Sequence, residues 1–202
     1  MNTIKTISGT FALIGGALLS ASANAGSQFE TGDTTPLTAS AHLDFTIVVP
    51  KFVALRVGTG AITASNPTVD SLVFTVPADQ IGNGTPVHAA NSEITAQVLG
   101  NNGPIMLSAT TPGAMNNGGG DVISYSQMDV AVAADTTATS LSHPVLVDGT
   151  STSISLPTTS GRVTNLDGKW TFTYRNTNVV PGGTYGGVNT RNSRVTYSVS
   201  MP

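Results

Sequence analysis

The chain has 202 residues, no cysteine and only 9% charged residues, against about 25% in an average soluble protein. This length fits one domain with an ordinary core, and the lack of cysteine excludes disulfides, thiol catalysis and cysteine-based metal sites. The net charge of −3 provides no basic surface for nucleic acid, and no cationic amphipathic stretch indicates a membrane-surface protein.

Residues 1–25 have the pattern of a cleaved secretory signal. One cation, Lys5, precedes a compact apolar run from Ile7 to Leu19, and Ala23-Asn24-Ala25 follows as a small-residue cleavage site. That run is too short to span a bilayer, and no later stretch reaches the roughly 18 apolar residues that a membrane span needs. We therefore expect residues 1–25 to be removed. The mature chain would begin at Gly26, without a membrane span, and be secreted.

The segment that follows changes character near residue 41. Residues 26–40 are polar and poorly patterned, which predicts a mobile N-terminal extension before a single domain at 41–202. Every second residue is then apolar, as in a half-buried strand: Leu43, Phe45, Ile47 and Val49. Pro50 interrupts the pattern because it has no N–H to donate. The alternation resumes from Phe52 to Val57, so we expect one long strand bent at Pro50.

Further short strands are expected along the rest of the chain, separated by turns rich in Gly, Pro and Asn. The predicted strands are Ser71–Val76, Ile94–Leu99, Ile105–Ala109, Met128–Ala133, Val145–Val147, Ser153–Leu156, Lys169–Arg175 and Arg194–Met201. No segment has a sustained helical period with caps. Many short strands without helices indicate a sandwich or a barrel. The uneven strand lengths favour an all-β fold with two sheets packed as a sandwich.

The C-terminal part of the chain, from Lys169 onward, has the clearest pattern. Trp170, Phe172 and Tyr174 alternate with polar residues, as in an aromatic-rich strand with one apolar face. A second alternating set continues to the end of the chain: Val195, Tyr197, Val199 and Met201. This final strand must be paired, and we expect Trp170, Phe172, Val195, Tyr197 and Val199 to contribute to the core or to packed sheet faces.

No catalytic motif is visible. The spacing from Gly161 to Lys169 does not fit a phosphate-binding loop, and Asp167-Gly168 is better interpreted as a hairpin turn before a strand. His42, His88 and His143 lack the spacing of metal ligands. We therefore expect no enzymatic activity, no cofactor and no metal site. Four aromatic residues remain open to two interpretations, core residues or a sugar-binding platform: Trp170, Tyr174, Tyr185 and Tyr197.

Two segments carry a resemblance to a known family. Val179-Val180-Pro181-Gly182-Gly183-Thr184-Tyr185-Gly186 is similar to the turn before the last strand of bacterial fimbrial subunits of the donor-strand type, and Arg194–Met201 is similar to that strand. Together they cover about a tenth of the chain. The lack of a disulfide departs from many such pilins, and residues 26–38 lack the alternating apolar residues of a donor strand.

The resemblance implies an immunoglobulin-like, pilin-like sandwich that polymerises head to tail through donation of a β-strand. Leu43–Val49 is the better donor candidate, with Leu43, Phe45, Ile47 and Val49 entering a neighbouring subunit. Such a fimbrial homopolymer on the bacterial cell surface, reached via the periplasm, would serve adhesion or biofilm formation. Its partners would be other copies of itself, with a periplasmic chaperone and an outer-membrane assembly protein. The alternatives are a monomeric secreted module that binds carbohydrate or protein, and a secreted hydrolase on a β scaffold.

Overall fold

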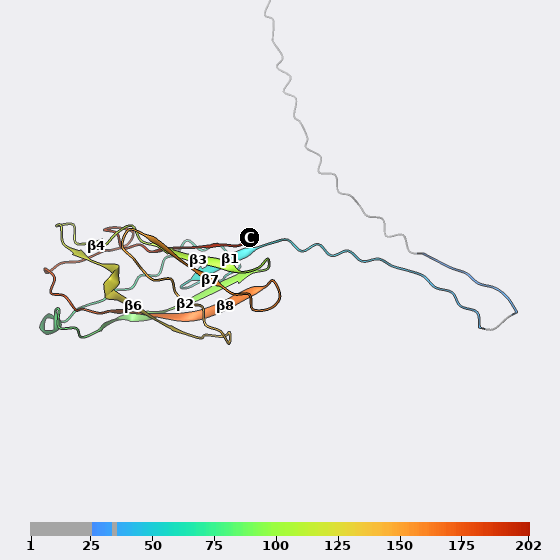
Figure 1. The fold of residues 1–202 in the computed structure, drawn as a ribbon, viewed down its shortest axis with the longest axis horizontal. Coiled ribbons are helices and arrows are strands. Elements are labelled where there is room, and N and C mark those ends of the chain that lie inside the picture. The colour runs from blue at the N-terminus through green and yellow to red at the C-terminus, as the bar shows by residue number, and fades with distance from the viewer. Residues whose placement is uncertain (1–25, 34–35) are drawn as a thin grey trace, which may run out of the picture. The chain divides into compact units, whose positions relative to one another are not determined.

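A computed structural model describes residues 26–33 and 36–202 (Figure 1). The predicted signal peptide, residues 1–25, lies outside the described residues. The chain divides into two units, one that ends at Val49 and a compact body from Pro50 to Pro202. The compact unit thus begins at Pro50, later than the expected start at residue 41. In the described part of the first unit no helix or strand is assigned.

The regular secondary structure of the body consists of antiparallel strands and two short 3-10 turns, which confirms the predicted all-β fold. The four-stranded sheet has the order β1 (Val53–Val57), β2 (Val87–Gly100), β8 (Thr164–Tyr174) and β6 (Met128–Ala133). The three-stranded sheet has the order β7 (Ser151–Leu156), β3 (Ile105–Thr110) and β9 (Thr196–Ser200). A small hairpin joins β4 (Met115–Asn116) to β5 (Val122–Ile123).

Helix is confined to two single turns of 3-10 helix in the described residues, Ala78–Gln80 and Tyr125–Gln127. None of the helices among these residues is long and apolar enough to cross a membrane.

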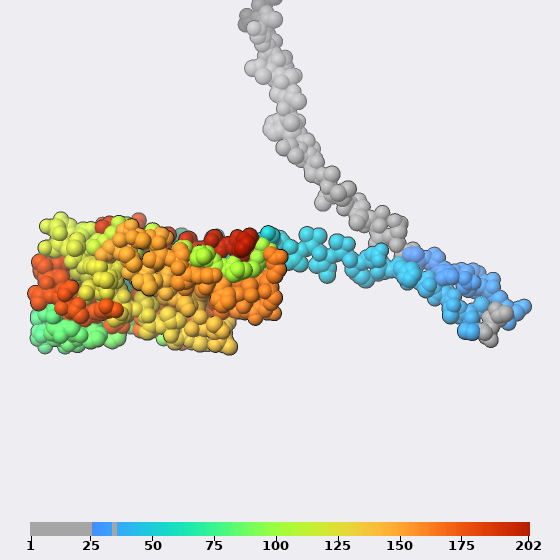
Figure 2. Space-filling view, in the orientation of Figure 1, coloured from blue at the N-terminus to red at the C-terminus, as the bar shows by residue number. Residues whose placement is uncertain are grey.

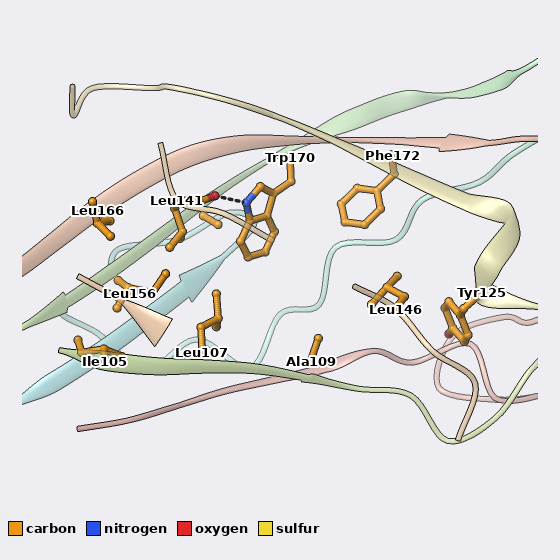
Figure 3. Close-up of a cluster of buried hydrophobic side chains, with 12 residues drawn as sticks. Ile105, Leu107, Ala109, Tyr125, Leu141, Leu146, Leu156, Leu166, Trp170 and Phe172 are labelled. Carbon is orange, nitrogen blue, oxygen red and sulfur yellow. Dashed lines mark hydrogen bonds between the residues drawn. The ribbon is translucent and has the colours of Figure 1, made fainter. Parts of the chain in front are cut away.

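The core lies between the two larger sheets, and aromatic side chains of β8 occupy its centre. Trp170 and Phe172 project from β8 toward Leu107 and Ala109 of β3 (Figure 3). Trp170 is fully buried, and Phe172 is 8% exposed. Val195, Tyr197 and Val199 are half-buried and pack against this cluster. The predicted contribution of these five residues to the core is therefore confirmed.

Three predicted strands are not strands in the structure. Ser71–Val76, Val145–Val147 and the stretch Leu43–Val49 are extended but pair with no strand in the described residues. Burial does alternate in Val145–Val147, where Leu146 is buried between the exposed Val145 and Val147. Alternating burial records only which side chains face the core, whereas a strand also needs a hydrogen-bonded neighbour. A period of two therefore predicts extended backbone more securely than it predicts sheet.

Candidate subunit interface

One side of the sandwich is closed by the chain itself. Residues 134–149 follow β6 and pass over the edge between the two sheets, in gold to orange on the visible face of Figure 2. This closing segment buries Leu141, Pro144 and Leu146 in the core. Its backbone is held as well, because Trp170 Nε1 donates to Leu141 O at 2.7 Å and Leu141 N donates to Asp167 O at 2.7 Å.

Asp167 anchors the start of the closing segment. Its carboxylate is 3% exposed and accepts four hydrogen bonds, from the backbone N–H and the hydroxyl of both Thr136 and Thr137. Burial would raise the pKa of Asp167, but these hydrogen bonds outweigh it and lower the pKa from 3.8 to about 2. The carboxylate therefore stays charged and holds the segment at neutral pH.

The prediction of a hairpin turn at Asp167-Gly168 is wrong, because both residues lie inside β8. A Cβ at position 168 would lie 3.0 Å from Leu141 N and 3.2 Å from Ala133 O. The glycine thus lets the closing segment approach the strand, and the aspartate binds that segment. Asp-Gly is a common turn sequence, but here the glycine is required by close packing and the aspartate by its hydrogen bonds to residues 136 and 137.

The opposite side of the sandwich is not closed in the same way. β1 and β9 are the edge strands of their sheets on this side and lie next to one another. β9 pairs with β3 along one edge, with Val199 opposite Leu107 and Tyr197 opposite Ala109. Its other edge has no partner strand among the described residues. The predicted pairing of the last strand is therefore present on one edge only.

A row of apolar side chains lines this open side without being fully buried. Val195, Tyr197, Val199 and Met201 come from β9 and its flanks, and all four are half-buried. Leu55 and Val57 of β1 are also half-buried and contact the same core. The side chains therefore pack against the core, and each keeps part of its surface exposed.

Ser71–Val76 forms a second wall of the open side. Leu72 and Phe74 pack against the core and Val76 is half-buried, while the residues between them are exposed. The main chain of this segment pairs with no strand among the described residues. An extended segment with unpaired N–H and C=O groups is a template for another strand. The open side thus offers unpaired backbone at β9 and at Ser71–Val76, in addition to the outer edge of β1.

The predicted donor residues lie in the other unit of the chain and are exposed. Phe45 is 83% and Ile47 is 86% exposed, and Leu43 and Val49 also expose at least half of their side-chain surface. Large apolar residues exposed in succession are unusual for a monomeric soluble protein and mark an interaction surface. The structure therefore contains both an exposed apolar segment and a domain with a half-buried apolar row next to an unpaired strand edge.

Of the four aromatic residues, Trp170, Tyr174 and Tyr197 are buried or pack against the core and Tyr185 is half-buried in a loop, so they do not form an exposed platform. Trp170 is fully buried, Tyr174 is 5% exposed, and Tyr197 is half-buried with its hydroxyl 2.7 Å from His143 Nε2. Tyr185 is half-buried and its hydroxyl donates to Pro181 O at 2.8 Å. The stacked, solvent-facing rings of a sugar platform are not present in this set.

His143 belongs to the closing segment and connects it to Tyr197 of β9. Its ring packs edge-on against Trp170, with centroids 4.7 Å apart, and against Phe172 at 5.5 Å. Burial lowers the pKa of His143 to about 4, although a hydrogen bond with the Pro144 backbone acts in the opposite direction. Burial raises the pKa of Tyr197. Both groups are therefore neutral at physiological pH. Their hydrogen bond connects the closing segment to β9.

No group of three or more His, Asp or Glu side chains in the described part of the chain could hold a metal ion. Comparison of the chain with protein-family models, with curated proteins and with solved structures gave no match. The assignment of this interface therefore rests on the geometry and the sequence alone.

Proposed function

We propose that the protein is a structural subunit of an extracellular filament, in which residues 43–49 of one copy fill the open side of the next. The observation that carries this proposal is the match between two features. One is an exposed stretch with an apolar residue at every second position, and the other is a half-buried apolar row flanked by unpaired backbone. Adding a strand to such an edge pairs the backbone groups and buries alternate side chains.

The direction of the added strand follows from where the chain enters the body and where β9 begins and ends. The chain enters the domain at Pro50, whose carbonyl accepts from Asn101 Nδ2. β9 ends nearby at Ser200, and the carbonyl of Pro202 just beyond it accepts from Asn102 Nδ2. A head-to-tail contact that does not close gives a filament. The strand of a neighbour must then enter from the far end of the domain, where β9 begins. Residues 43–49 of that neighbour would run antiparallel to β9.

Composition supports a polymer of this type. The whole chain has eight Lys and Arg against eleven Asp and Glu, and removal of Lys5 with the signal leaves a net charge of −4. Low charge leaves little repulsion between stacked copies. Secretion, a fimbrial location, a function in adhesion or biofilm, and help from a chaperone and an outer-membrane assembly protein all belong to this proposal.

Paired substitutions in the donor segment test the proposal. Replacement of Phe45 and Ile47 by Asp should abolish filaments, because each of the two side chains would otherwise contribute about 1.5–3 kcal/mol on burial. The matched control replaces Thr46 and Val48 by Asp, which adds the same charge to the other face of the strand. Filaments sheared from cells would be counted by negative-stain electron microscopy.

A synthetic peptide of residues 41–50 distinguishes pairing of the strand with a neighbouring subunit from pairing within its own subunit. If the strand acts between subunits, the Phe45/Ile47 variant should fold as a monomer when the peptide is supplied. If it acts within its own subunit, the variant should unfold and the peptide should not restore it. A wild-type chain lacking residues 26–49 that is monomeric and stable without any partner would refute the proposal and favour the secreted binding module.

A further inference from the structure

Met201 fills the end of the open side at which β9 finishes. Its side chain packs against the core, and its sulfur accepts a hydrogen bond from Asn102 N at 3.2 Å. A Cβ at position 100 would lie 3.0 Å from Met201 Sδ and 3.3 Å from Phe52 O. Gly100, the last residue of β2, therefore leaves room for the sulfur. The side chain of Met201 thus reaches from the end of β9 across to β2, next to the start of β1.

β1 and β9 come together along the open side. Cα atoms of the two strands lie within 8 Å of one another, although the strands belong to different sheets. A strand inserted between two others and paired with both would hold them about 9–10 Å apart, twice the usual strand spacing. No further strand therefore fits between β1 and β9 where they are in contact. The contacts of Met201 over Gly100 place this closed end beside Phe52.

The other end of the open side, where β9 begins at Thr196, has a different wall. β1 ends at Val57, and Ser71–Val76 is hydrogen-bonded to no strand among the described residues. The first two residues of this segment line a hollow together with Ala90–Ile94 of β2, past the stretch of β2 that pairs with β1. A strand that enters from this end would meet unpaired backbone on both sides before it reaches Met201.

We propose that Met201 is the stop that sets the register of the donor segment of a neighbouring copy. Two registers keep the apolar side chains of an antiparallel strand toward the core. In the deeper one Leu43 lies opposite Met201 and Phe45 opposite Val199. In the shallower one, two residues further out, Leu43 lies opposite Val199 and Phe45 opposite Tyr197. We expect the shallower register, and the stop rests on the proposed function because the donor segment is that of the proposed filament.

The space at the closed end is the reason for this choice. In the deeper register the side chain of Leu43 would have to enter beside Met201. Protein interiors have few voids larger than a water molecule, and the sulfur already occupies the space over Gly100 next to Phe52 O. Met201 is therefore a positioning residue, which decides where the strand pairs with β9 and is distinguished from a purely structural residue by its effect on register.

Paired cysteines measure the register in assembled filaments. The protein has no cysteine, so Thr46→Cys combined with either Thr196→Cys or Ser198→Cys allows one kind of disulfide between copies. All three positions are exposed. Thr46 lies opposite Thr196 in the shallower register and opposite Ser198 in the deeper one. Residues directly opposite one another can form a disulfide, whereas diagonal neighbours, about 7–8 Å apart, are too distant.

A ladder of covalent oligomers on a non-reducing denaturing gel reports the disulfide. We expect at least about tenfold more ladder from the Thr46/Thr196 pair than from the Thr46/Ser198 pair. Met201→Ala removes the stop and should produce a ladder from the Thr46/Ser198 pair, whereas Met201→Leu keeps the bulk and should not. Met106→Ala is the matched control, because Met106 is 42% exposed on β3, and it should change neither ladder.

The comparison between the two pairs needs no change at Met201, so it decides the register even if Met201→Ala does not fold. A strong ladder from the Thr46/Ser198 pair with Met201 in place would overturn the stop, as would a folded Met201→Ala variant without the added ladder. Filaments in electron micrographs that give no ladder from either pair would also overturn it, while their formation would still support the proposed function. A wild-type chain that forms no filament would refute the proposed function itself.

Discussion

The buried histidine makes the stability of the domain sensitive to mild acid. His143 is neutral in the folded protein, with its pKa lowered from 6.5 to about 4 mainly by burial. In the unfolded chain the same imidazole binds a proton below about pH 6.5. The contribution of His143 to stability is therefore fully present above pH 6.5 and is lost as the pH falls toward 4. A difference of about 2.5 pKa units corresponds to about 3 kcal/mol at pH 4.

The neighbours of His143 explain why this charge would be costly. Trp170, Phe172 and Tyr197 surround the ring, and none of them carries a charge near neutral pH. Asp167 titrates in a different window, because its lowered pKa of about 2 causes a loss of stability only as the pH falls below about 3.8. The interval from pH 6.5 to 4 therefore isolates the histidine.

Urea unfolding of the chain from Gly26, followed by tryptophan fluorescence at pH 7 and pH 4, measures this effect. The peptide of residues 41–50 is present in excess in each sample. We expect the free energy of unfolding to fall by about 3 kcal/mol between the two pH values. His143→Gln keeps a polar group near Tyr197 but cannot gain the charge, so its stability should change much less. Equal pH dependence in the two proteins would refute the reasoning.

The core, the closing segment and the signal each give a further prediction. Phe172→Ala should lower the free energy of unfolding by about 3–5 kcal/mol, measured by urea titration, and a loss below about 1 kcal/mol would contradict its position in the core. Asp167→Ala removes the acceptor of the Thr136 and Thr137 backbone N–H groups and should lower the free energy of unfolding by about 1–3 kcal/mol. Amide exchange at Leu141 should become faster, and unchanged exchange would show that the Asp167 carboxylate does not hold the segment. N-terminal sequencing of the exported protein should begin at Gly26, and retention of Met1 would remove the argument for export.

Much of the fold could be predicted because the domain is built from alternating strands. Met128–Ala133 is the predicted strand without any change of bounds, and the predicted Ile105–Ala109 differs from β3 by one residue. In β3, and in the first part of β6, the side chains alternate between the core and the surface, as the pattern requires. The sequence of the last strand also identified Tyr197 and Val199, since alternation continues through both residues.

The errors came from interactions between segments that are distant in the sequence. The sequence around Asp167-Gly168 has the composition of a turn, and only the approach of residues 134–141 explains why the pair lies within a strand. Ser71–Val76 has the alternation of a strand, but whether it pairs depends on a neighbour that the described chain does not supply. Local composition contains no information about either partner.

The candidate site was predicted in part. The alternation of Leu43, Phe45, Ile47 and Val49 singled out a segment that the structure shows to be exposed, and its donation to a neighbour stays a prediction. The lack of pairing at Ser71–Val76 was missed, because the segment was interpreted as an ordinary strand. The hydrogen bonds of the Asn101 side chain with Phe52 N and Pro50 O were also missed, because Asn101 was interpreted as part of a turn. The Asn-Asn-Gly sequence in that turn was the available signal, but side-chain hydrogen bonds to the distant Pro50 and Phe52 cannot be read from it.

The stability of the domain and the stability of the proposed filament are coupled through the open side. Four donor side chains at about 1.5–3 kcal/mol each would contribute about 6–12 kcal/mol on burial, before the cost of ordering the segment. This is comparable to the total stability of a typical domain, about 5–15 kcal/mol. In the proposed filament, a chain without disulfides would therefore gain much of its stability only when a neighbour binds. The half-buried row and the unpaired strand edge would make an isolated subunit prone to aggregate during the proposed export, which is the physical reason why a filament of this design would need a chaperone until the next strand is in place.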